Sequence, residues 1–274
     1  MPLLKPLSGF KLAYDMHSSL PQQLTNFRFS ESYLLIRIFA ALERSALAHS
    51  EAVITICPDL YNYARAQGVQ PERLFLIENS IFDDVRLANG ADRTALPLAP
   101  LEQAVNPLAG PRIVYAGTFE PYQGVDLLVR AFAEVHRRRP DAELVLVGGR
   151  PDQGDAIRAL AARLGLGDAC RLTGQVPKAV ARRWLESAAI LVSPRIEGTN
   201  TPLKIYEQLA SGKPLVATSI WSHTQVLTGE ICFLVEPNAD ALAAGLLRAL
   251  CDPAESTRRA GNAGRLYEGP TRDR

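Results

Sequence analysis

Residues 191–218 read LVSPRIEGTNTPLKIYEQLASGKPLVAT, and this stretch decides the fold. The apolar run at 190–192 ends in Ser193-Pro194, which predicts a buried strand that stops at the edge of a sheet. A polar loop at 195–200 precedes a helical segment, and the run at 215–217 predicts a second strand. Strand, loop, helix and strand in this order form one βαβ unit, in which ligands bind where the loops leave the sheet.

The helix of this unit has clear start and stop signals. Thr201 is expected at its N-cap and Pro202 at its first position, where proline is favoured. Gly212 follows the last turn, as glycine does at many helix C-termini. A period of 3.6 residues divides the side chains between two faces. We expect Leu203, Ile205, Tyr206, Leu209 and Ala210 on the buried face, and Lys204, Glu207, Gln208 and Ser211 on the polar face.

Lys204 lies in the first turn of this helix, where the helix dipole and the free N–H groups favour an anion. A cation there costs roughly 0.3–1 kcal/mol, and an anionic ligand shared with the helix N-terminus would reverse the sign. The alternative is a solvated face on which Lys204 pairs with Glu207, a contact worth about 0.2–0.5 kcal/mol. We favour the first interpretation, with a phosphate group as the anion.

The stretch resembles the nucleotide-binding helix of family 4 retaining glycosyltransferases, which have the GT-B fold. Those enzymes usually carry two glutamates eight residues apart, in a pattern like E-G-x-G-x-x-x-x-E-A-x-A-x-G-x-P-V-V-A. Glu207 matches the second glutamate, and the resemblance implies that it accepts hydrogen bonds from the nucleotide ribose. Thr199 stands at the first position, and Glu197, two residues earlier, is the acidic candidate for contact with the donor sugar. Asn200-Thr201-Pro202 stand where family members usually carry glycine and phenylalanine.

A second loop of the family is recognisable after the strand predicted at 112–116. The family writes this loop G-R-L-x-x-x-K-G, and its arginine and lysine normally grip the donor diphosphate. Here the loop begins at Gly117 and the two cations are replaced by Thr118 and Gln123. Two charge-assisted contacts, each worth about 1.5–3 kcal/mol, are therefore missing. We expect Lys204 and Arg195 to supply that charge, with the loop N–H groups as further donors.

Two glycines, Gly148 and Gly149, follow the strand predicted at 143–147. They permit either the close approach of a ligand to the backbone or simply a tight turn. In the family, the base stacks near the segment that corresponds to residues 173–177. We count both glycines among the donor-binding candidates.

The N-terminal part carries another candidate, His17, after a strand predicted at 11–14. A lone histidine at a strand end is usually a surface or structural group. Family members, however, often carry a histidine at this strand end, near the donor sugar. A helix at 31–49, strands at 52–57 and 74–77 and a helix from Pro58 follow. Whether the apolar side of the helix at 31–49 contacts a membrane or faces the core stays open.

Bulk properties narrow the class of protein. The 274 residues include 30 basic and 29 acidic side chains, so a nucleic-acid binder that works by charge is not expected. Four distant cysteines show no metal-ligand spacing, and we expect Cys57 and Cys232 to be buried thiols. No apolar run approaches the roughly 20 residues that span a bilayer. We therefore expect a soluble cytoplasmic protein, with the inner face of the membrane as a further location.

The predicted fold class is α/β: GT-B, with two Rossmann-like doubly wound parallel-sheet domains. We place an N-terminal domain at 1–95, a linker at 96–111, a C-terminal domain at 112–268 and a tail at 269–274. The family has several βα units before the strand at 11–14 that are not in this sequence, so we expect the N-terminal domain to be incomplete. The last residues also differ from the helix that usually closes the family fold.

The resemblance implies transfer of a sugar, with retention, from a nucleotide-diphosphate sugar to a hydroxyl of a glycan, lipid or small molecule, as in polysaccharide biosynthesis. We expect no metal and no cofactor. One alternative is a non-catalytic donor-binding fragment or inactive paralogue, and another is a nucleotide-sugar epimerase on the same fold. The catalytic candidates are His17, Glu197 and Lys204. The donor-binding candidates are Gly117, Thr118, Gln123, Gly148, Gly149, Arg195, Thr199, Asn200, Thr201 and Glu207.

Overall fold

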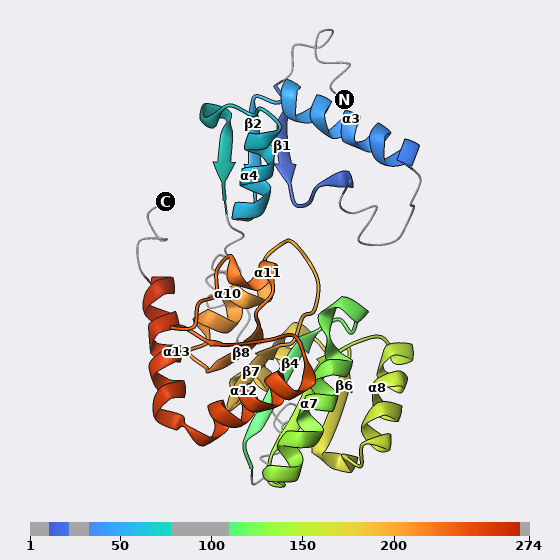
Figure 1. Ribbon diagram of the computed structural model, residues 1–274, viewed down its shortest axis with the longest axis vertical. Helices are drawn as coiled ribbons and strands as arrows, with labels where there is room; N and C mark the ends of the chain where they lie inside the picture. Colours follow the sequence, from blue (N-terminus) through green and yellow to red (C-terminus); the bar gives the residue numbers. More distant parts are fainter. Residues whose placement is uncertain (1–10, 22–32, 78–109, 269–274) are drawn as a thin grey trace. The chain divides into compact units, whose positions relative to one another are not determined.

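The computed structural model describes residues 11–21, 33–77 and 110–268 (Figure 1). The chain forms two compact units. Unit 1 is Met1–Ser80 with Thr199–Thr201, and unit 2 is Ile81–Gly198 with Pro202–Arg274. The linker predicted at 96–111 and the tail predicted at 269–274 lie outside the described residues, apart from 110 and 111.

Unit 1 contains a parallel sheet of strands β1 (Ala13–Met16), β2 (Ala52–Thr55) and β3 (Leu74–Leu76), in that order. Its helices are α3 (Tyr33–His49) and α4 (Pro58–Ala66), with a 3-10 turn η2 (Pro71–Arg73). Strand β1 lies two residues later than predicted, because its register pairs Ala13 with Ala52 and Met16 with Thr55. Met16 is buried and fixes this register through a small core with Leu47, Val53 and Leu60.

The apolar side of α3 is mostly exposed. Leu34, Ile38 and Leu42 have exposed fractions of 68%, 47% and 56%, and the buried residues of the helix are Glu43 and Leu47. Among the described residues, most of the apolar side of α3 therefore does not face a core, which was one of the two alternatives left open. The Glu43 carboxylate is stabilised in the interior because it accepts three hydrogen bonds. The donors are Ser19 Oγ (3.1 Å), Leu20 N (2.6 Å) and Tyr63 OH (2.6 Å).

Unit 2 contains a six-stranded parallel sheet with the strand order β6-β5-β4-β7-β8-β9. The strands are β4 (Arg112–Gly117), β5 (Glu143–Gly148), β6 (Cys170–Gly174), β7 (Ile190–Ser193), β8 (Leu215–Thr218) and β9 (Phe233–Val235). The helices are α7 (Val125–Arg138), α8 (Pro151–Arg163), α9 (Lys178–Glu186), α10 (Leu203–Ala210), α11 (Trp221–Thr224), α12 (Ala239–Cys251) and α13 (Pro253–Glu268), with 3-10 turns η3 (Pro121–Gln123) and η4 (Gly167–Ala169). The order runs outward from β4 in both directions, which confirms the predicted doubly wound sheet.

Side chains of the central strands alternate between two hydrophobic cores on opposite faces of this sheet. Ile113 and Leu144 pack with residues of α7, α8 and α12 on one face (Figure 1). Val114 and Val145 pack with residues of α9, α10 and α13 on the other. Strands buried on both faces read as continuous apolar runs, which is why β4, β5 and β7 could be predicted from the sequence.

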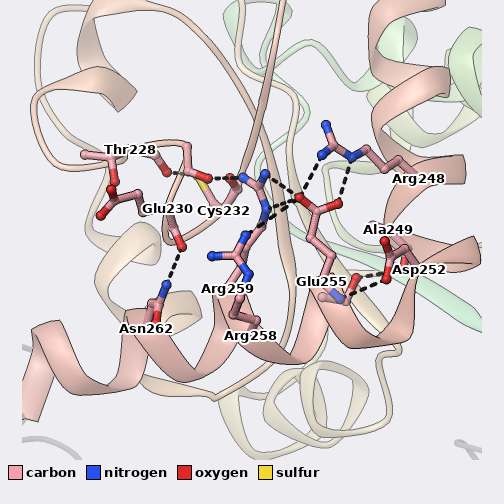
Figure 2. Close-up of polar contacts among 12 residues, drawn as sticks. Thr228, Glu230, Cys232, Arg248, Ala249, Asp252, Glu255, Arg258, Arg259 and Asn262 are labelled. Carbon is pink, nitrogen blue, oxygen red and sulfur yellow. Dashed lines mark hydrogen bonds and ion pairs between the residues drawn. The ribbon is translucent and has the colours of Figure 1, made fainter.

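The carboxylate of Glu255, in α13, connects this helix to α12 through hydrogen bonds (Figure 2). It accepts hydrogen bonds from Arg248, at 2.7 and 2.8 Å, and from Arg259, at 2.7 and 3.1 Å. Arg259 also donates to the carbonyl oxygens of Gly229 and Cys232, so the same cluster holds the segment before β9. This cluster sets the position of α13 on the domain.

The composition-based expectations for the cysteines are confirmed where the structure describes them. Cys57, Cys170 and Cys232 are buried free thiols, and Cys251 is exposed. Within the described residues, the structure has no helix whose length and apolar character would let it cross a bilayer.

Candidate functional site

The strand order of unit 2 reverses between β4 and β7, which lie next to each other in the sheet. In doubly wound sheets, ligands bind outside the carboxyl ends of the strands at such a reversal. The loop after β4 ends at Gly124, and the loop after β7 begins at Pro194. These two loops and the start of α10 form the candidate site.

Two contacts hold the loops together. Ile196 N donates a hydrogen bond of 2.9 Å to the carbonyl oxygen of Tyr122. Gly124 has a left-handed backbone with φ of 66°, and a Cβ atom there would lie 2.1 Å from the carbonyl oxygen of Pro194. Only glycine fits this approach, so the last glycine of the first loop is required by packing.

Lys204 reaches from α10 to the first loop. Its Nζ donates a hydrogen bond of 3.0 Å to Gln123 Oε1 and lies 4.4 Å from the centroid of the Tyr115 ring. Among the described residues, no carboxylate forms an ion pair with Lys204, so the alternative in which it pairs with Glu207 is wrong. Burial, and secondarily the charge of Arg195, lowers the pKa of Lys204 to about 7. An ammonium in such a place is stabilised by any anion that enters the site.

Arg195 is the second cation of the site. Its guanidinium carbon lies 5.2 Å from the centroid of the Tyr122 ring, and its Nε donates a hydrogen bond of 2.7 Å to the carbonyl oxygen of Glu197. Burial lowers the pKa of Arg195, although a guanidinium keeps its proton at neutral pH. The structure therefore brings Lys204, Arg195 and Gln123 together, as the sequence predicted, and adds two tyrosine rings beneath the cations.

Gly148 and Gly149 are required by close packing at the strand ends. A Cβ atom at Gly148 would lie 2.1 Å from the carbonyl oxygen of Gly117, and one at Gly149 would lie 2.4 Å from the Phe119 ring. The tight-turn interpretation is thus confirmed, and contact with a ligand stays a prediction. Both glycines also line a pocket of about 290 Å³. The other lining residues are Arg150, Pro151, Gly154, Arg158, Leu172, Gly174 and Gln175.

Three other candidates have exposed side chains. Thr118, Glu197 and Glu207 are all accessible to a ligand from solvent. The carbonyl oxygen of Thr118 is occupied, because it accepts a hydrogen bond of 2.6 Å from Tyr115 OH. Exposure leaves the Glu207 carboxylate available as a hydrogen-bond acceptor for a ribose.

The start of α10 differs from the prediction by one residue. Pro202 is the N-cap, in an extended backbone conformation, and the helix begins at Leu203. Thr201 makes no side-chain capping bond, and its buried hydroxyl has no hydrogen-bond partner in the part of the chain that the structure describes. Gly212 is left-handed, with φ of 67°, so the predicted C-terminal stop is confirmed.

The predicted faces of α10 also need correction. Gln208 is buried and Leu203 is 46% exposed. The reason is that α13 packs against α10 and covers part of the face that was expected to be polar. A helical period shows which side chains share a face, but not which second helix covers it.

Unit 1 brings together the remaining candidates. His17 is exposed, its Nε2 lies 3.1 Å from Asp15 Oδ2, and its carbonyl oxygen accepts a hydrogen bond of 2.8 Å from Asn200 Nδ2. Thr199 Oγ1 donates a hydrogen bond of 3.4 Å to Asn200 Oδ1. Thus Asn200 contacts the segment after β1, and Thr199 contacts Asn200.

Sequence reasoning missed the residues that hold the cations. Tyr115 and Tyr122 looked like ordinary core and loop residues, since nothing in the sequence says which ring faces an ammonium. It also missed His223, whose buried ring joins Ser193 Oγ (3.0 Å) to the carbonyl oxygen of Thr218 (2.8 Å). Burial lowers the pKa of His223 to about 4, so the ring is neutral at physiological pH.

The chain is similar to known proteins along much of its length. A family model described as glycosyl transferases group 1 matches residues 110–252. The phosphatidyl-myo-inositol mannosyltransferase of Mycobacterium leprae is 31% identical over 170 residues, which cover 61% of this chain and 44% of that protein. The D-inositol 3-phosphate glycosyltransferase of Acidothermus cellulolyticus is 29% identical over 199 residues, covering 68% and 42%. The matched part is less than half the length of either relative.

Among solved structures, HepE from Anabaena in complex with UDP and glucose has a similar fold. The TM-score is 0.74 at 18% sequence identity, and the match covers 97% of this chain and 69% of HepE. At this level of identity the likeness concerns the fold alone. It confirms the predicted GT-B class.

Proposed function

The chain belongs to the glycosyl transferases group 1 family, and on this premise we propose that it moves a sugar from a nucleotide-diphosphate sugar to an acceptor hydroxyl, with retention. One observation carries the proposal. The ammonium of Lys204 is held against Gln123, at the point of the first loop where the resembled family has its diphosphate-binding lysine. With the lysine supplied from α10 instead of from the first loop, the site keeps the charge that a diphosphate needs.

The proposed donor position follows the two loops and the pocket. The diphosphate lies at the strand reversal, near the Lys204 ammonium, Arg195 and the N–H groups after Gly117. The base enters the pocket of about 290 Å³ beside Gly148 and Gly149, and Glu207 accepts hydrogen bonds from the ribose. The UDP in the HepE structure supports a nucleotide as ligand. The named activities of the two curated relatives support a hexosyl group as the transferred sugar.

The proposed chemistry needs charge stabilisation at two places. As the bond to the anomeric carbon breaks, an oxocarbenium-like centre develops there and negative charge develops on the departing diphosphate. Lys204 and the loop N–H groups stabilise that diphosphate charge in a site that is already organised for it. We assign His17 and Glu197 to the sugar side of the reaction. We expect no divalent metal to be required, and reversible loss of donor binding with a chelator would contradict this.

The experiment that tests the proposal is calorimetric titration with UDP and GDP. We expect one of them to bind, and Lys204→Gln to weaken it by about tenfold to 150-fold, the equivalent of one charge-assisted contact of about 1.5–3 kcal/mol. Lys213→Gln is the matched control, because Lys213 follows the opposite end of α10 and precedes β8, whereas the candidate site lies at the carboxyl ends of the strands. Glu207→Gln should weaken binding, whereas Glu186→Gln, an exposed glutamate of α9, should not.

Two results would count against the proposal. If the intact chain bound neither nucleotide, the site would not be a donor site. If it bound a nucleotide sugar but released no nucleotide from it, with or without hydroxyl acceptors, it would be the non-catalytic donor-binding protein. Formation of the C2 or C4 epimer of the donor would instead indicate the epimerase.

The acceptor and the location belong to the same proposal. A glycan, a lipid or a small molecule with a free hydroxyl is consistent with the site. A cytoplasmic location, with contact to the inner face of the membrane through α3, is consistent with the exposed Leu34, Ile38 and Leu42 of that helix.

A further inference from the structure

Tyr115 is a fully buried side chain at the carboxyl end of β4, and both of its ends contact the candidate site. Its ring face lies under the Lys204 ammonium, with Nζ 4.4 Å from the ring centroid. Its hydroxyl donates a hydrogen bond of 2.6 Å to the carbonyl oxygen of Thr118 in the first loop. We propose that Tyr115 is a positioning residue of the donor site, which sets both the place of the cation and the shape of the loop. This inference rests on the proposed function.

The polar end of Tyr115 has a role that the core does not require. A phenylalanine at position 115 would fill the same core, where the ring packs 6.1 Å from Phe119, but it would leave the Thr118 carbonyl without this donor. Burial raises the pKa of Tyr115, so its hydroxyl keeps the proton that it donates. This hydrogen bond holds the carbonyl of Thr118 inward at the start of the loop, and the N–H groups of Gln123 and Gly124 close the loop onto the carbonyl oxygens of Glu120 and Pro121.

Gly117 shows how closely the three groups meet. A Cβ atom there would lie 2.9 Å from Tyr115 OH and 3.5 Å from Lys204 Nζ. Gly117 also has φ of 151°, within the range that favours glycine. The end of β4 is thus shaped around the contact between the tyrosine and the lysine, and a side chain at 117 would separate them.

The ring also affects the charge of Lys204. The groups that face this ammonium are the Tyr115 ring from β4, the Gln123 amide from η3 and the Arg195 guanidinium from the loop after β7. His223 of α11 lies near enough for the charge of Lys204 to contribute to the lowered pKa of its ring, which is neutral at physiological pH. Burial and Arg195 disfavour the charged form of Lys204, whereas the negative face of an aromatic ring favours it. The pH at which Lys204 loses its proton therefore reports on the ring.

The test compares two variants by the pH dependence of donor affinity. UDP-glucose and GDP-mannose are suitable probes, because neither titrates between about pH 6 and about pH 8.5. Tyr115→Phe keeps the ring but loses the hydroxyl. We therefore expect a roughly two- to tenfold loss of donor affinity at every pH, whereas the pH midpoint of the affinity profile stays unchanged. Tyr115→Leu removes the ring, so we expect a larger loss and a midpoint at lower pH. Tyr115→Met serves in its place if the leucine variant does not fold.

Phe132→Leu is the matched control, since Phe132 is a fully buried aromatic residue of the same core in α7. It should lower the thermal midpoint of unfolding and leave the pH profile of affinity unchanged. If Tyr115→Leu had the same pH midpoint as Phe132→Leu, Tyr115 would be a core residue only and the inference would be overturned. If the unmodified chain bound neither probe near pH 6, the proposed function itself would fail, which is a different and separable result.

Discussion

Lys204 Nζ donates a hydrogen bond of 3.0 Å to Gln123 Oε1, across 81 residues of sequence. In the pattern that the first loop resembles, position 123 carries a lysine, whereas the pattern for the helix leaves position 204 unspecified. The protein therefore presents an ammonium group at nearly the same place, but from α10. A diphosphate responds to where the charge is and not to which residue carries it.

Exchanging the two side chains tests this relationship. Lys204→Gln should weaken donor binding by about tenfold to 150-fold, because one charge-assisted contact is lost. The double variant Gln123→Lys, Lys204→Gln restores a lysine–glutamine pair in the opposite order, and we expect its affinity to return to within about tenfold of the unmodified chain. Calorimetric titration measures both. Equal weakness of the single and the double variant would mean that the ammonium must come from α10.

Donor affinity should depend on pH through Lys204. Its pKa in the free protein is about 7, and a bound anion raises it, so binding takes up a proton. Affinity is then greatest below pH 7 and falls by up to about tenfold per pH unit above it. Titrations with UDP-glucose in buffers of different ionisation enthalpy give the number of protons taken up. Lys204→Arg stays charged throughout, so it should show neither effect, and the same pH slope in that variant would exclude Lys204 as the source.

Lys204 should also reduce stability. Its pKa is about 7 in the folded state and about 10.5 in the unfolded state, so the unfolded chain binds more protons between these values. The loss of folding stability caused by Lys204 is absent above about pH 10.5, grows as the pH falls and is fully present below about pH 7. Lys204→Met should therefore raise the free energy of unfolding at pH 7 by on the order of 1–4 kcal/mol, while donor binding is lost. Urea denaturation measures the change, and a destabilised variant would show that the ammonium is already compensated.

Glu255 should stabilise the packing of α13. Glu255→Gln removes the charge that Arg259 and Arg248 share, so we expect a lower thermal midpoint at pH 7. The hydrogen bond from Arg259 is the main cause of the lowered pKa of Glu255. The stabilisation is thus present above the ordinary pKa of a glutamate and is lost as pH falls through the lowered value. The difference between variant and unmodified chain should vanish in acid.

The control for Glu255 is Glu134→Gln. Glu134 forms ion pairs with Arg137 and Arg138 within α7, on an exposed surface, and such pairs contribute little. An equal effect of the two substitutions would mean that the Glu255 cluster does not hold α13 in place.

The exposed apolar side of α3 should bind lipid surfaces. Replacing Leu34, Ile38 and Leu42 by serine removes the apolar area that would enter the headgroup region. We expect the unmodified chain to sediment with anionic vesicles and the triple variant to stay in the supernatant. Leu164→Ser, at an exposed leucine after α8, is the control. Sedimentation of the triple variant with the vesicles would rule out α3 as the contact.

Prediction of the fold from sequence succeeded where the signals are local. The buried strands of unit 2 could be predicted from continuous apolar runs, because a strand buried on both faces needs apolar residues throughout. The end of α10 could be predicted from Gly212, because a left-handed backbone favours glycine. Strand β1 was misplaced by two residues, because its register is set by pairing with β2 and not by its own sequence. Pro202, and not Thr201, is the N-cap of α10, although threonine is the residue type favoured at that position.

The sequence by itself determined the fold class and the two loops of the candidate site, and it selected Lys204 as an unusual cation in a first helical turn. Only the tertiary structure decided what Lys204 contacts. Gln123 and the Tyr115 ring come from elements distant in the chain, and their approach depends on strand order and loop shape. Residue type and spacing act along the chain, whereas the environment of a charge is made by groups that folding brings together.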